Sequence, residues 1–325
     1  MKVFITSAYP YHEKDNYTPC YLSESANNDL FRVHELVDNP AEADIIIFAE
    51  HHPDADPYFF GVLRNDIYKK YKSKCYLYHD HDNTIALIPY ITPSLSQKHS
   101  DPIFNQPFSY IVQLSPNNVI RGYAAVEKKK FLFSFMGTSR THPVRKEIFA
   151  ITYDRCCLLD TLNKNSWELS NETKADYQKS YAKACFQSKF ILCPRGNGPN
   201  SYRLYESMEM GIAPVIISDD WVPTAGPKWE EFSIRVAESD VKKIPEILEK
   251  CEADSERMGE LARQAWVEWF AKDKQFHYLA EACLKLHAAR HQVNHATYLA
   301  QYLRFLEPFH ARNLLRFYKN RLVEK

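Results

Sequence analysis

The 325-residue chain has no excess of either charge, because 41 Lys and Arg balance 41 Asp and Glu. This balance argues against a nucleic-acid partner, which requires a broad basic surface. The sequence also lacks any run of about 18 apolar residues, so we expect no membrane-spanning helix. Its first residues, Met1–Thr6, begin directly as a strand, without the apolar stretch and cleavage site of a signal peptide. From these absences we expect a cytoplasmic protein.

Paired cysteines are also missing. The eight cysteines include no C-x-x-C pair and no spacing that is typical of a zinc site. Several of them lie inside apolar runs, as Cys193 does at the end of Phe-Ile-Leu-Cys. We therefore expect free, buried thiols in a reducing compartment.

The sequence does contain apolar runs of strand length that alternate with helical segments. Ile45–Ala49 and Ala213–Ile217 are continuously apolar, which suits parallel strands buried on both faces. A polar, turn-rich segment is expected up to Asn28. Further strands are expected at 2–6, 74–78, 131–136 and 190–193, and helices at 29–38, 60–72, from 143, 174–188, 201–210, 244–251, 256–269 and 275–325 with a break at Pro308. This order predicts an α/β protein with parallel sheets.

The length is sufficient for two domains. Residues 84–130 show no clear pattern, and the change to Glu127-Lys-Lys-Lys suggests a boundary between 121 and 131. We divide the chain into an N-terminal lobe at 1–125, a second lobe at 126–275 and a C-terminal helical segment at 276–325.

The strongest local pattern is a strand, a loop rich in Gly and Pro, and a helix at 190–211. The helix opens with Asn200-Ser201, and its first turn offers unpaired N–H groups and the positive end of the helix dipole. Such a helix start is a natural binding place for a diphosphate. Loops of this kind are usually plain connections. Here, however, the loop lies at the carboxyl end of a predicted strand, where open α/β sheets bind their ligands.

Charged side chains strengthen the case for a site in this segment. Arg195 and Arg203 can donate forked hydrogen bonds to phosphate oxygens. Glu206 lies three residues beyond Arg203 on the same side of the helix, where a carboxylate can accept hydrogen bonds from ribose hydroxyls. The pattern therefore indicates a nucleotide site.

The run from Phe190 to Pro223 resembles the signature of exostosin-like glycosyltransferases. It contains, in the order of that family, a strand, a Pro-rich loop, Ser-x-Arg-x-x-Glu, Gly-x-x-Pro-Val-Ile-Ile and Asp-x-Trp-x-Pro. The resemblance covers 131–225. Weaker similarity lies at 39–48, at His79-Asp, and at Phe133–Gly137 followed by Arg145, and none is found over 270–325.

The resemblance implies a GT-B fold, with two Rossmann-like lobes facing a central cleft and C-terminal helices. It implies transfer of a sugar from a nucleoside-diphosphate sugar, foremost a UDP-sugar, to a hydroxyl of a glycan or lipid-linked glycan in polysaccharide biosynthesis. Inversion, with no metal or other cofactor, is also implied. The implied donor-binding residues are Arg140, Arg195, Asn200, Ser201, Arg203 and Glu206. Those implied near the donor sugar or acceptor are Asp219, Asp220 and Trp221, although Trp221 equally suits a packing role.

An inverting transfer needs a base for the acceptor hydroxyl, which we expect from the N-terminal lobe. Asp80 and Asp82 follow a predicted strand and are the first candidates, and Glu50 and His51 are the next pair. The segment His79–Asp82 has other interpretations, namely the Asp-x-Asp metal motif of GT-A transferases, a metallohydrolase site, or a plain polar loop. The alternative functions are therefore a metal-dependent hydrolase centred on His79–Asp82 and a non-catalytic sugar-nucleotide-binding protein.

The C-terminal stretch from Arg304 is basic, with six Lys and Arg against two Glu, and it has an amphipathic pattern. One interpretation is a surface helix that contacts an anionic membrane near a lipid-linked acceptor. The other, which we favour, is a terminal helix docked on the protein with a solvated basic face.

Overall fold

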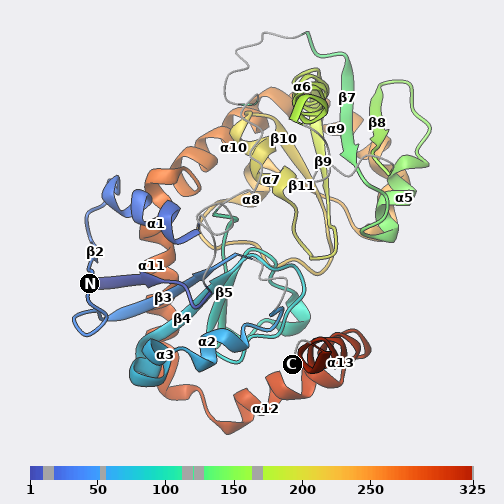
Figure 1. Ribbon diagram of the computed structural model, residues 1–325. Helices are drawn as coiled ribbons and strands as arrows, with labels where there is room; N and C mark the ends of the chain where they lie inside the picture. Colours follow the sequence, from blue (N-terminus) through green and yellow to red (C-terminus); the bar gives the residue numbers. More distant parts are fainter. Residues whose placement is uncertain (10–17, 52–55, 112–119, 121–127, 163–170, 324–325) are drawn as a thin grey trace. The chain divides into compact units, whose positions relative to one another are not determined.

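The computed structural model describes residues 1–9, 18–51, 56–111, 120, 128–162 and 171–323 (Figure 1). The chain forms two compact units. The first comprises Met1–Leu114, Val222–Ala225 and Lys272–Lys325, and the second comprises Ser115–Trp221 and Gly226–Ala271. The C-terminal helices, which the sequence analysis set apart at 276–325, are thus part of the first unit. The expected boundary at 125–126 lies outside the described residues.

The first unit is built on a parallel sheet with the strand order β2-β1-β3-β4-β5-β6. Residues of β3 face the two sides in turn. Ile45 and Ile47 pack toward helices α1 (Thr18–Asn27) and α11 (Lys272–Ala289), while Ile46 and Phe48 pack toward α2 (Phe60–Arg64) and α3 (Asp66–Tyr71). This double burial explains the unbroken apolar run. The strands are β1 Lys2–Thr6, β2 Glu35–Leu36, β3 Ile45–Glu50, β4 Cys75–His79, β5 Tyr90–Thr92 and β6 Asn105–Pro107.

Helices cover both faces of this sheet, and α11 contacts α1 on one of them (Figure 1). The helix expected over 60–72 is two helices, because Asn65 caps the second one by accepting a hydrogen bond from the N–H of Ile67 at 2.9 Å. The helices are α1 Thr18–Asn27, α2 Phe60–Arg64, α3 Asp66–Tyr71, α11 Lys272–Ala289, α12 His295–Leu303 and α13 Pro308–Val323.

The second unit contains a parallel sheet with the order β11-β10-β9-β7-β8. One face packs on α5 and α9, and α6, α7 and α10 contact the central strands. The strands are β7 Phe131–Gly137, β8 Cys156–Asp160, β9 Ser188–Pro194, β10 Ala213–Ile217 and β11 Ile234–Arg235. The helices are α5 Pro143–Phe149, α6 Asn171–Phe186, α7 Tyr202–Glu209, α8 Trp229–Phe232, α9 Ile244–Cys251 and α10 Ser255–Trp269. Both units are therefore Rossmann-like, as a GT-B protein requires.

The helix expected at 29–38 is wrong. The carboxylate of Asp29 accepts hydrogen bonds from the N–H groups of Phe31 at 3.3 Å and Arg32 at 3.0 Å, which is a turn and not a helix. Arg32 has a φ of 52°, in the left-handed region. Glu35 and Leu36 then pair with β1 as the edge strand β2.

The expectation of a polar, turn-rich segment up to Asn28 is also wrong at its end, because Thr18–Asn27 forms α1. Ser25 attaches this helix to α11 by donating to the carbonyl of Lys272 and accepting from the N–H of Phe276 at 2.9 Å. A contact over about 250 positions of chain leaves no local signal in the sequence.

All eight cysteines are free, and four of them, Cys75, Cys185, Cys193 and Cys283, are buried. The expectation of buried thiols fails for Cys20, which is exposed on α1. Burial raises the pKa of the Cys75 thiol to about 12, so this thiol stays protonated and unreactive near neutral pH.

The C-terminal helix α13 begins at Pro308, where the sequence predicted a break, and it docks on the first unit. Phe317 is buried and lies 5.4 Å from Phe60 between ring centroids. Leu315 and Tyr318 are exposed. None of the described helices is both long enough and apolar enough to cross a membrane.

Candidate active site

Three loops of the second unit follow the carboxyl ends of β7, β9 and β10. The strands are parallel and adjacent, and Pro194 at the end of β9 pairs with Ile217 at the end of β10. Their loops therefore leave the same edge of the sheet, which is the edge that binds ligands in open α/β folds. Every residue that the sequence analysis placed at the donor follows one of these three strands.

Arg203, on the first turn of α7, is fixed against the end of β7. Its Nε donates to the carbonyl of Met136 at 2.9 Å, and its guanidinium lies 5.2 Å from the ring centroid of Phe135. Gly137 makes room for it, because a Cβ at that position would lie 2.7 Å from Nη2 of Arg203. Ser201 caps the helix by accepting a hydrogen bond from the N–H of Arg203 at 3.4 Å.

Arg203 also keeps its charge. Burial alone would lower the pKa of its guanidinium, but Tyr181, Tyr177 and Glu206 outweigh that effect and raise the pKa. Glu206 is held in turn by Tyr181 of α6, whose hydroxyl donates to Oε2 at 2.7 Å. A cation and a carboxylate thus stand in defined positions on neighbouring turns of α7.

Arg145, at the start of α5, joins the loops after β7 and β9. Its buried side chain donates to the carbonyls of Arg195 at 2.8 Å, Pro194 at 3.2 Å and Thr138 at 3.3 Å. A Cβ on Gly196 would lie 3.2 Å from Nη2 of Arg145, so the loop approaches the guanidinium closely. Arg145 belongs to the segment that resembles the family, but the resemblance implied no role for it. We find that it positions the segment that carries Arg195.

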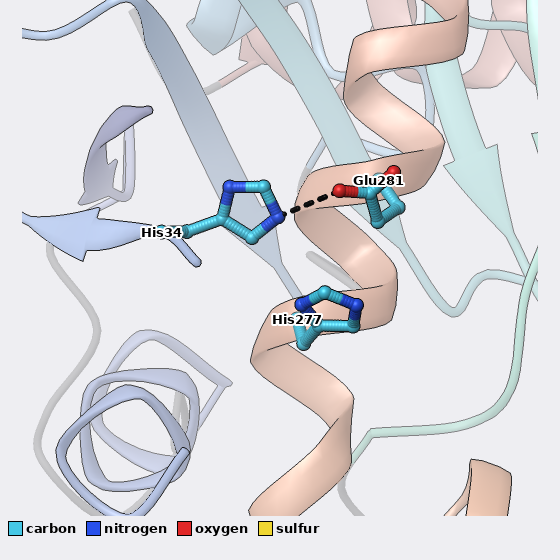
Figure 2. Close-up of side chains that lie close together, drawn as sticks. All are labelled: His34, His277 and Glu281. Atoms are coloured by element: carbon cyan, nitrogen blue, oxygen red, sulfur yellow. Dashed lines mark hydrogen bonds and ion pairs between the residues drawn. The ribbon is translucent and has the colours of Figure 1, made fainter. Parts of the chain in front are cut away.

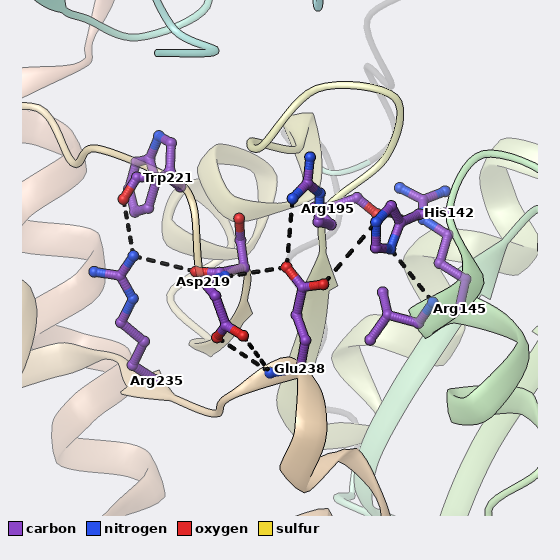
Figure 3. A network of polar contacts seen from close by, with 9 residues as sticks. His142, Arg145, Arg195, Asp219, Trp221, Arg235 and Glu238 are labelled. Carbon is purple, nitrogen blue, oxygen red and sulfur yellow. Dashed lines mark hydrogen bonds and ion pairs between the residues drawn. The ribbon is translucent and has the colours of Figure 1, made fainter. Parts of the chain in front are cut away.

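Glu238 is the central residue of a polar network at the same edge, shown in Figure 3. Its Oε1 lies 3.5 Å from Nη1 of Arg195 and accepts a hydrogen bond from the N–H of Asp219 at 3.1 Å. The carboxylate of Asp219 accepts from the N–H of Glu238 at 3.2 Å. On the other side of Glu238, Nε2 of His142 lies 4.0 Å from Oε2 of Glu238. Burial and the neighbouring Arg195 lower the pKa of His142, which keeps it neutral near pH 7.

Sequence reasoning missed Glu238. It lies 35 positions after Arg203, at the beginning of a short 3-10 helix at Glu238–Lys243. The pairing of β11 with β10 brings it to the loops, and nothing in its local sequence marks it.

Trp221, one of the predicted sugar-side residues, has structural partners. Trp221 is 1% exposed and packs edge-on against Trp229, with centroids 5.2 Å apart. Its carbonyl accepts a hydrogen bond from Arg235 at 2.8 Å. These contacts support the packing role that the sequence analysis left open for Trp221. Asp220 is partly buried, and Arg140 is exposed in the loop after β7.

Buried polar atoms without a hydrogen-bond partner among the described residues also occur on these loops. They are Oγ1 of Thr141, Nε of Arg195 and Oγ of Ser218. Each follows one of the three strands β7, β9 and β10. Buried polar groups are normally paired, so a ligand with several acceptor oxygens would satisfy donors of this kind. Asn200, by contrast, is occupied within the loop, since its Oδ1 accepts from the N–H of Ser201 at 2.7 Å.

In the first unit, His51 and Asp80 form a pair at the ends of β3 and β4. Nδ1 of His51 lies 2.6 Å from Oδ2 of Asp80. The side chain of Asp80 is 2% exposed and that of His51 is 12% exposed, so the imidazole is the more accessible partner. The structure brings together the first-choice residue Asp80 and the second-choice residue His51.

Asp82 does not share that environment. Its Oδ1 accepts hydrogen bonds from Ser94 at 3.1 Å and Tyr110 at 3.3 Å. The ring of His79 is buried between Phe59 and Tyr90, at centroid distances of 5.1 and 5.3 Å. His79, Asp80 and Asp82 therefore have separate surroundings and do not converge as the ligands of one ion.

Glu50 is fully buried at the end of β3. It accepts hydrogen bonds from the hydroxyl of Ser7 and the N–H of Ala8, both at 2.7 Å. Burial raises its pKa to about 7, although both hydrogen bonds oppose the shift. Its oxygens brace the turn after β1, which gives Glu50 a structural role.

Two Rossmann-like units, with arginines that follow the carboxyl ends of β7 and β9, define an α/β protein suited to a phosphorylated ligand. The exostosin GT47 domain model matches residues 71–251, which is more than half of the chain. The chain therefore belongs to the exostosin GT47 family.

Curated relatives agree with this family. An exostosin-1 homolog of Caenorhabditis elegans is 26% identical over 162 residues, which is 45% of this chain and 42% of the relative. A probable glucuronosyltransferase of Oryza sativa subsp. japonica is 41% identical over 85 residues, which is 26% of this chain and 20% of the relative. The probable glucuronoxylan glucuronosyltransferase IRX7 of Arabidopsis thaliana is 31% identical over 147 residues, covering 43% and 31%. The chain spans less than half the length of each relative.

Solved structures resemble the chain more distantly. HepE of Anabaena in complex with UDP matches with a TM-score of 0.42 at 10% identity, covering 88% of this chain and 99% of that one. MurG of Acinetobacter baumannii matches with a TM-score of 0.37 at 11% identity, covering 87% and 99%.

Proposed function

We propose that this protein is a glycosyltransferase that moves a sugar from a nucleoside-diphosphate sugar to a hydroxyl of a glycan or lipid-linked glycan. Membership of the exostosin GT47 family supports the reaction class. Matched relatives are named as glucuronosyltransferases and as a xylosyltransferase, so glucuronate and xylose are the first sugars to test. We take UDP as the first nucleotide to test, and we propose transfer with inversion and without a catalytic metal.

The fixed position of Arg203 carries the proposal. The Met136 carbonyl, the Phe135 ring and the absence of a side chain at Gly137 hold its guanidinium at the carboxyl end of β7. A guanidinium that is charged and already in place loses little entropy when it binds a phosphate. Glu206, held by Tyr181, is the proposed acceptor for the ribose hydroxyls.

The charge that develops on the leaving group decides the chemistry of the donor side. The bond between the anomeric carbon and the phosphate oxygen breaks, and the electron pair leaves with the nucleoside diphosphate. Arg203 and Arg195 stabilise that negative charge, which lowers the barrier. Oε1 of Glu238 lies 3.5 Å from Arg195 and orients this guanidinium.

We propose the His51–Asp80 pair as the base on the acceptor side, in place of Asp80 or Asp82 alone. Asp80 accepts the Nδ1–H of His51, which leaves Nε2 as the nitrogen that takes the acceptor proton. The acceptor oxygen then attacks the anomeric carbon, and Asp80 stabilises the imidazolium that forms. Asp82, bound to Ser94 and Tyr110, orients its own loop.

A thermal-shift titration with UDP, GDP and CDP, each with and without EDTA, tests the donor site. A ligand that binds only the folded protein raises the melting temperature. We expect a shift with one nucleoside diphosphate that EDTA does not remove. No shift with any of the three would overturn the donor site, and a shift that EDTA abolishes would overturn metal independence.

The second measurement separates an enzyme from a binding protein. Release of the nucleoside diphosphate from its sugar nucleotide is followed with glycan hydroxyl acceptors and with water alone. Acceptor-dependent release supports a transferase. Binding without release would instead establish the non-catalytic alternative.

A cytoplasmic location and membrane contact through α13 remain predictions, and fractionation of the expressing cells tests both.

A further inference from the structure

A cluster of two histidines and one glutamate lies in the first unit, outside the residues discussed so far (Figure 2). His34 immediately precedes β2, and His277 and Glu281 lie one turn apart on α11. One potential ligand atom from each side chain lies within 4.8 Å of those of the other two. Among the described residues, this is the one group of three or more His, Cys, Asp or Glu with that spacing.

The surroundings of the two imidazoles are unusual for a purely structural contact. His34 has a side chain that is 1% exposed, and its Nε2 lies 2.9 Å from Oε1 of Glu281. Nδ1 of His34 and Nδ1 of His277 are both buried without a hydrogen-bond partner among the described residues. Phe31 stacks on His277 with ring centroids 3.9 Å apart.

We propose that His34, His277 and Glu281 bind a divalent transition-metal ion, with Zn²⁺ as the best fit. Two imidazole nitrogens and one carboxylate oxygen form a ligand set that suits zinc better than magnesium or calcium, which prefer oxygen ligands alone. Zinc bonds of about 2.0–2.2 Å place ligand atoms closer together than 4.8 Å, so a ring rotation of His277 completes the site. The side chain of Glu281 is 41% exposed, so a water molecule can take the fourth coordination position beside it.

Such an ion would join two segments that are far apart in the sequence. The turn that ends at His34 lies against α11 through the Glu281 contact, and both segments belong to the first unit. The ion therefore has a structural role in fastening edge strand β2 to α11. It is separate from the donor residues, all of which belong to the second unit, so its presence neither requires nor excludes the proposed transferase activity.

The simpler explanation is an ion pair between His34 and Glu281, with His277 held only by packing. The variant His277→Gln separates the two explanations, because it removes one metal ligand and leaves the ion pair intact. The matched control is His295→Gln, since His295 is exposed on α12 and outside the cluster.

The experiment titrates the full chain with Zn²⁺ by calorimetry, and a Co²⁺ absorption spectrum identifies the ligand type. We expect one ion per chain for the wild type and the control, and a loss of about 100-fold or more in affinity for His277→Gln. Melting temperatures with added Zn²⁺ should rise in step with that affinity. The proposal is overturned if the wild type binds no ion, if His277→Gln binds like the wild type, or if Co²⁺ shows thiolate bands from the free cysteines.

Discussion

The loops at the carboxyl ends of the two parallel sheets present different polar side chains. In the second unit, Arg203 and the nearby Arg145 are fixed by backbone carbonyls, and Arg195 lies beside the carboxylate of Glu238. In the first unit, the loops contain the carboxyl groups of Glu50, Asp80 and Asp82, which are held by hydroxyl, imidazole and backbone N–H groups. The same architecture thus supports two chemically different edges.

This difference matches what the two halves of the proposed sugar transfer need. The departing diphosphate needs positive charge that is already in place, whereas the acceptor hydroxyl needs a group that can take a proton. A variant in one unit should therefore affect one half of the reaction and spare the other. The predictions below test this separation, beginning with the largest expected effect.

Asp80→Asn should lower the rate of transfer by about 10²–10⁴-fold, the usual contribution of a general base, because the amide no longer stabilises a protonated His51. The affinity for the nucleoside diphosphate should stay within about twofold of the wild type, since an independent site is not affected. Turnover assays and calorimetry measure the two quantities. Asp66→Asn, at an exposed position on α3, is the control. Full activity in Asp80→Asn would place the base elsewhere.

Arg203→Ala should weaken nucleotide binding by about 30–100-fold, which corresponds to about 2–3 kcal/mol for lost hydrogen bonds to a charged group. The reason is the removal of a guanidinium that is already fixed by Met136 and Phe135. Calorimetry with UDP measures the effect, and Arg257→Ala on the surface of α10 is the matched control. An unchanged affinity would contradict the assignment of the donor site.

Glu50→Gln should change how stability depends on pH. Burial raises the pKa of Glu50 to about 7 in the folded protein, so between pH 4.5 and 7 the folded state keeps a proton that the unfolded state has released. The free energy of unfolding therefore falls as pH rises through this range, by about 3 kcal/mol. Glu50→Gln lacks this titrating group, so its free energy of unfolding should not show this fall. The free energy of unfolding of the variant relative to the wild type should therefore grow toward pH 8.

Urea unfolding at pH 5 and pH 8 measures this dependence. The exposed Glu230→Gln serves as the control and should follow the wild type at both values. If Glu50→Gln also follows the wild type, Glu50 is ionised in the folded protein and the carboxylates of the first unit are better solvated than their burial indicates.

Gly137→Ala should have the smallest effect. The new Cβ would lie 2.7 Å from the end of the Arg203 side chain and 3.0 Å from Phe135, so the flexible guanidinium has to move. We expect UDP affinity to fall by about fivefold to tenfold, or about 1 kcal/mol, while the melting temperature changes by at most about 2 °C. A large loss of stability with normal affinity would show that Gly137 serves the fold and not the site.

Much of the second unit was predictable because its signals are local. The run Ala213–Ile217 forms β10 with the expected bounds, and Ser201 caps α7 at the start of the expected helix. Gly211 closes that helix with a φ of 69°. Apolar runs, caps and positive-φ glycines act within a few residues, so the sequence displays them directly.

The first unit was less predictable because its elements depend on distant partners. The helix α1 rests on α11 through Ser25, and the pattern at 29–38 that indicated a helix is overruled by the carboxylate of Asp29. The short strands β5 and β6 lie within the stretch that showed no clear pattern. They form because β5 pairs with β4 and β6 pairs with β5. Propensity over three residues is too weak to define such strands.

The sequence by itself determined the parallel α/β architecture, the family resemblance and the placement of Arg203 and Glu206 on one helix, because these follow from local order along the chain. Only the tertiary structure decided that Glu238 meets Arg195, that His51 pairs with Asp80, and that His34 lies beside α11. Those contacts join residues that are 29 to 247 positions apart, and their geometry depends on strand order and helix packing, which no local pattern encodes.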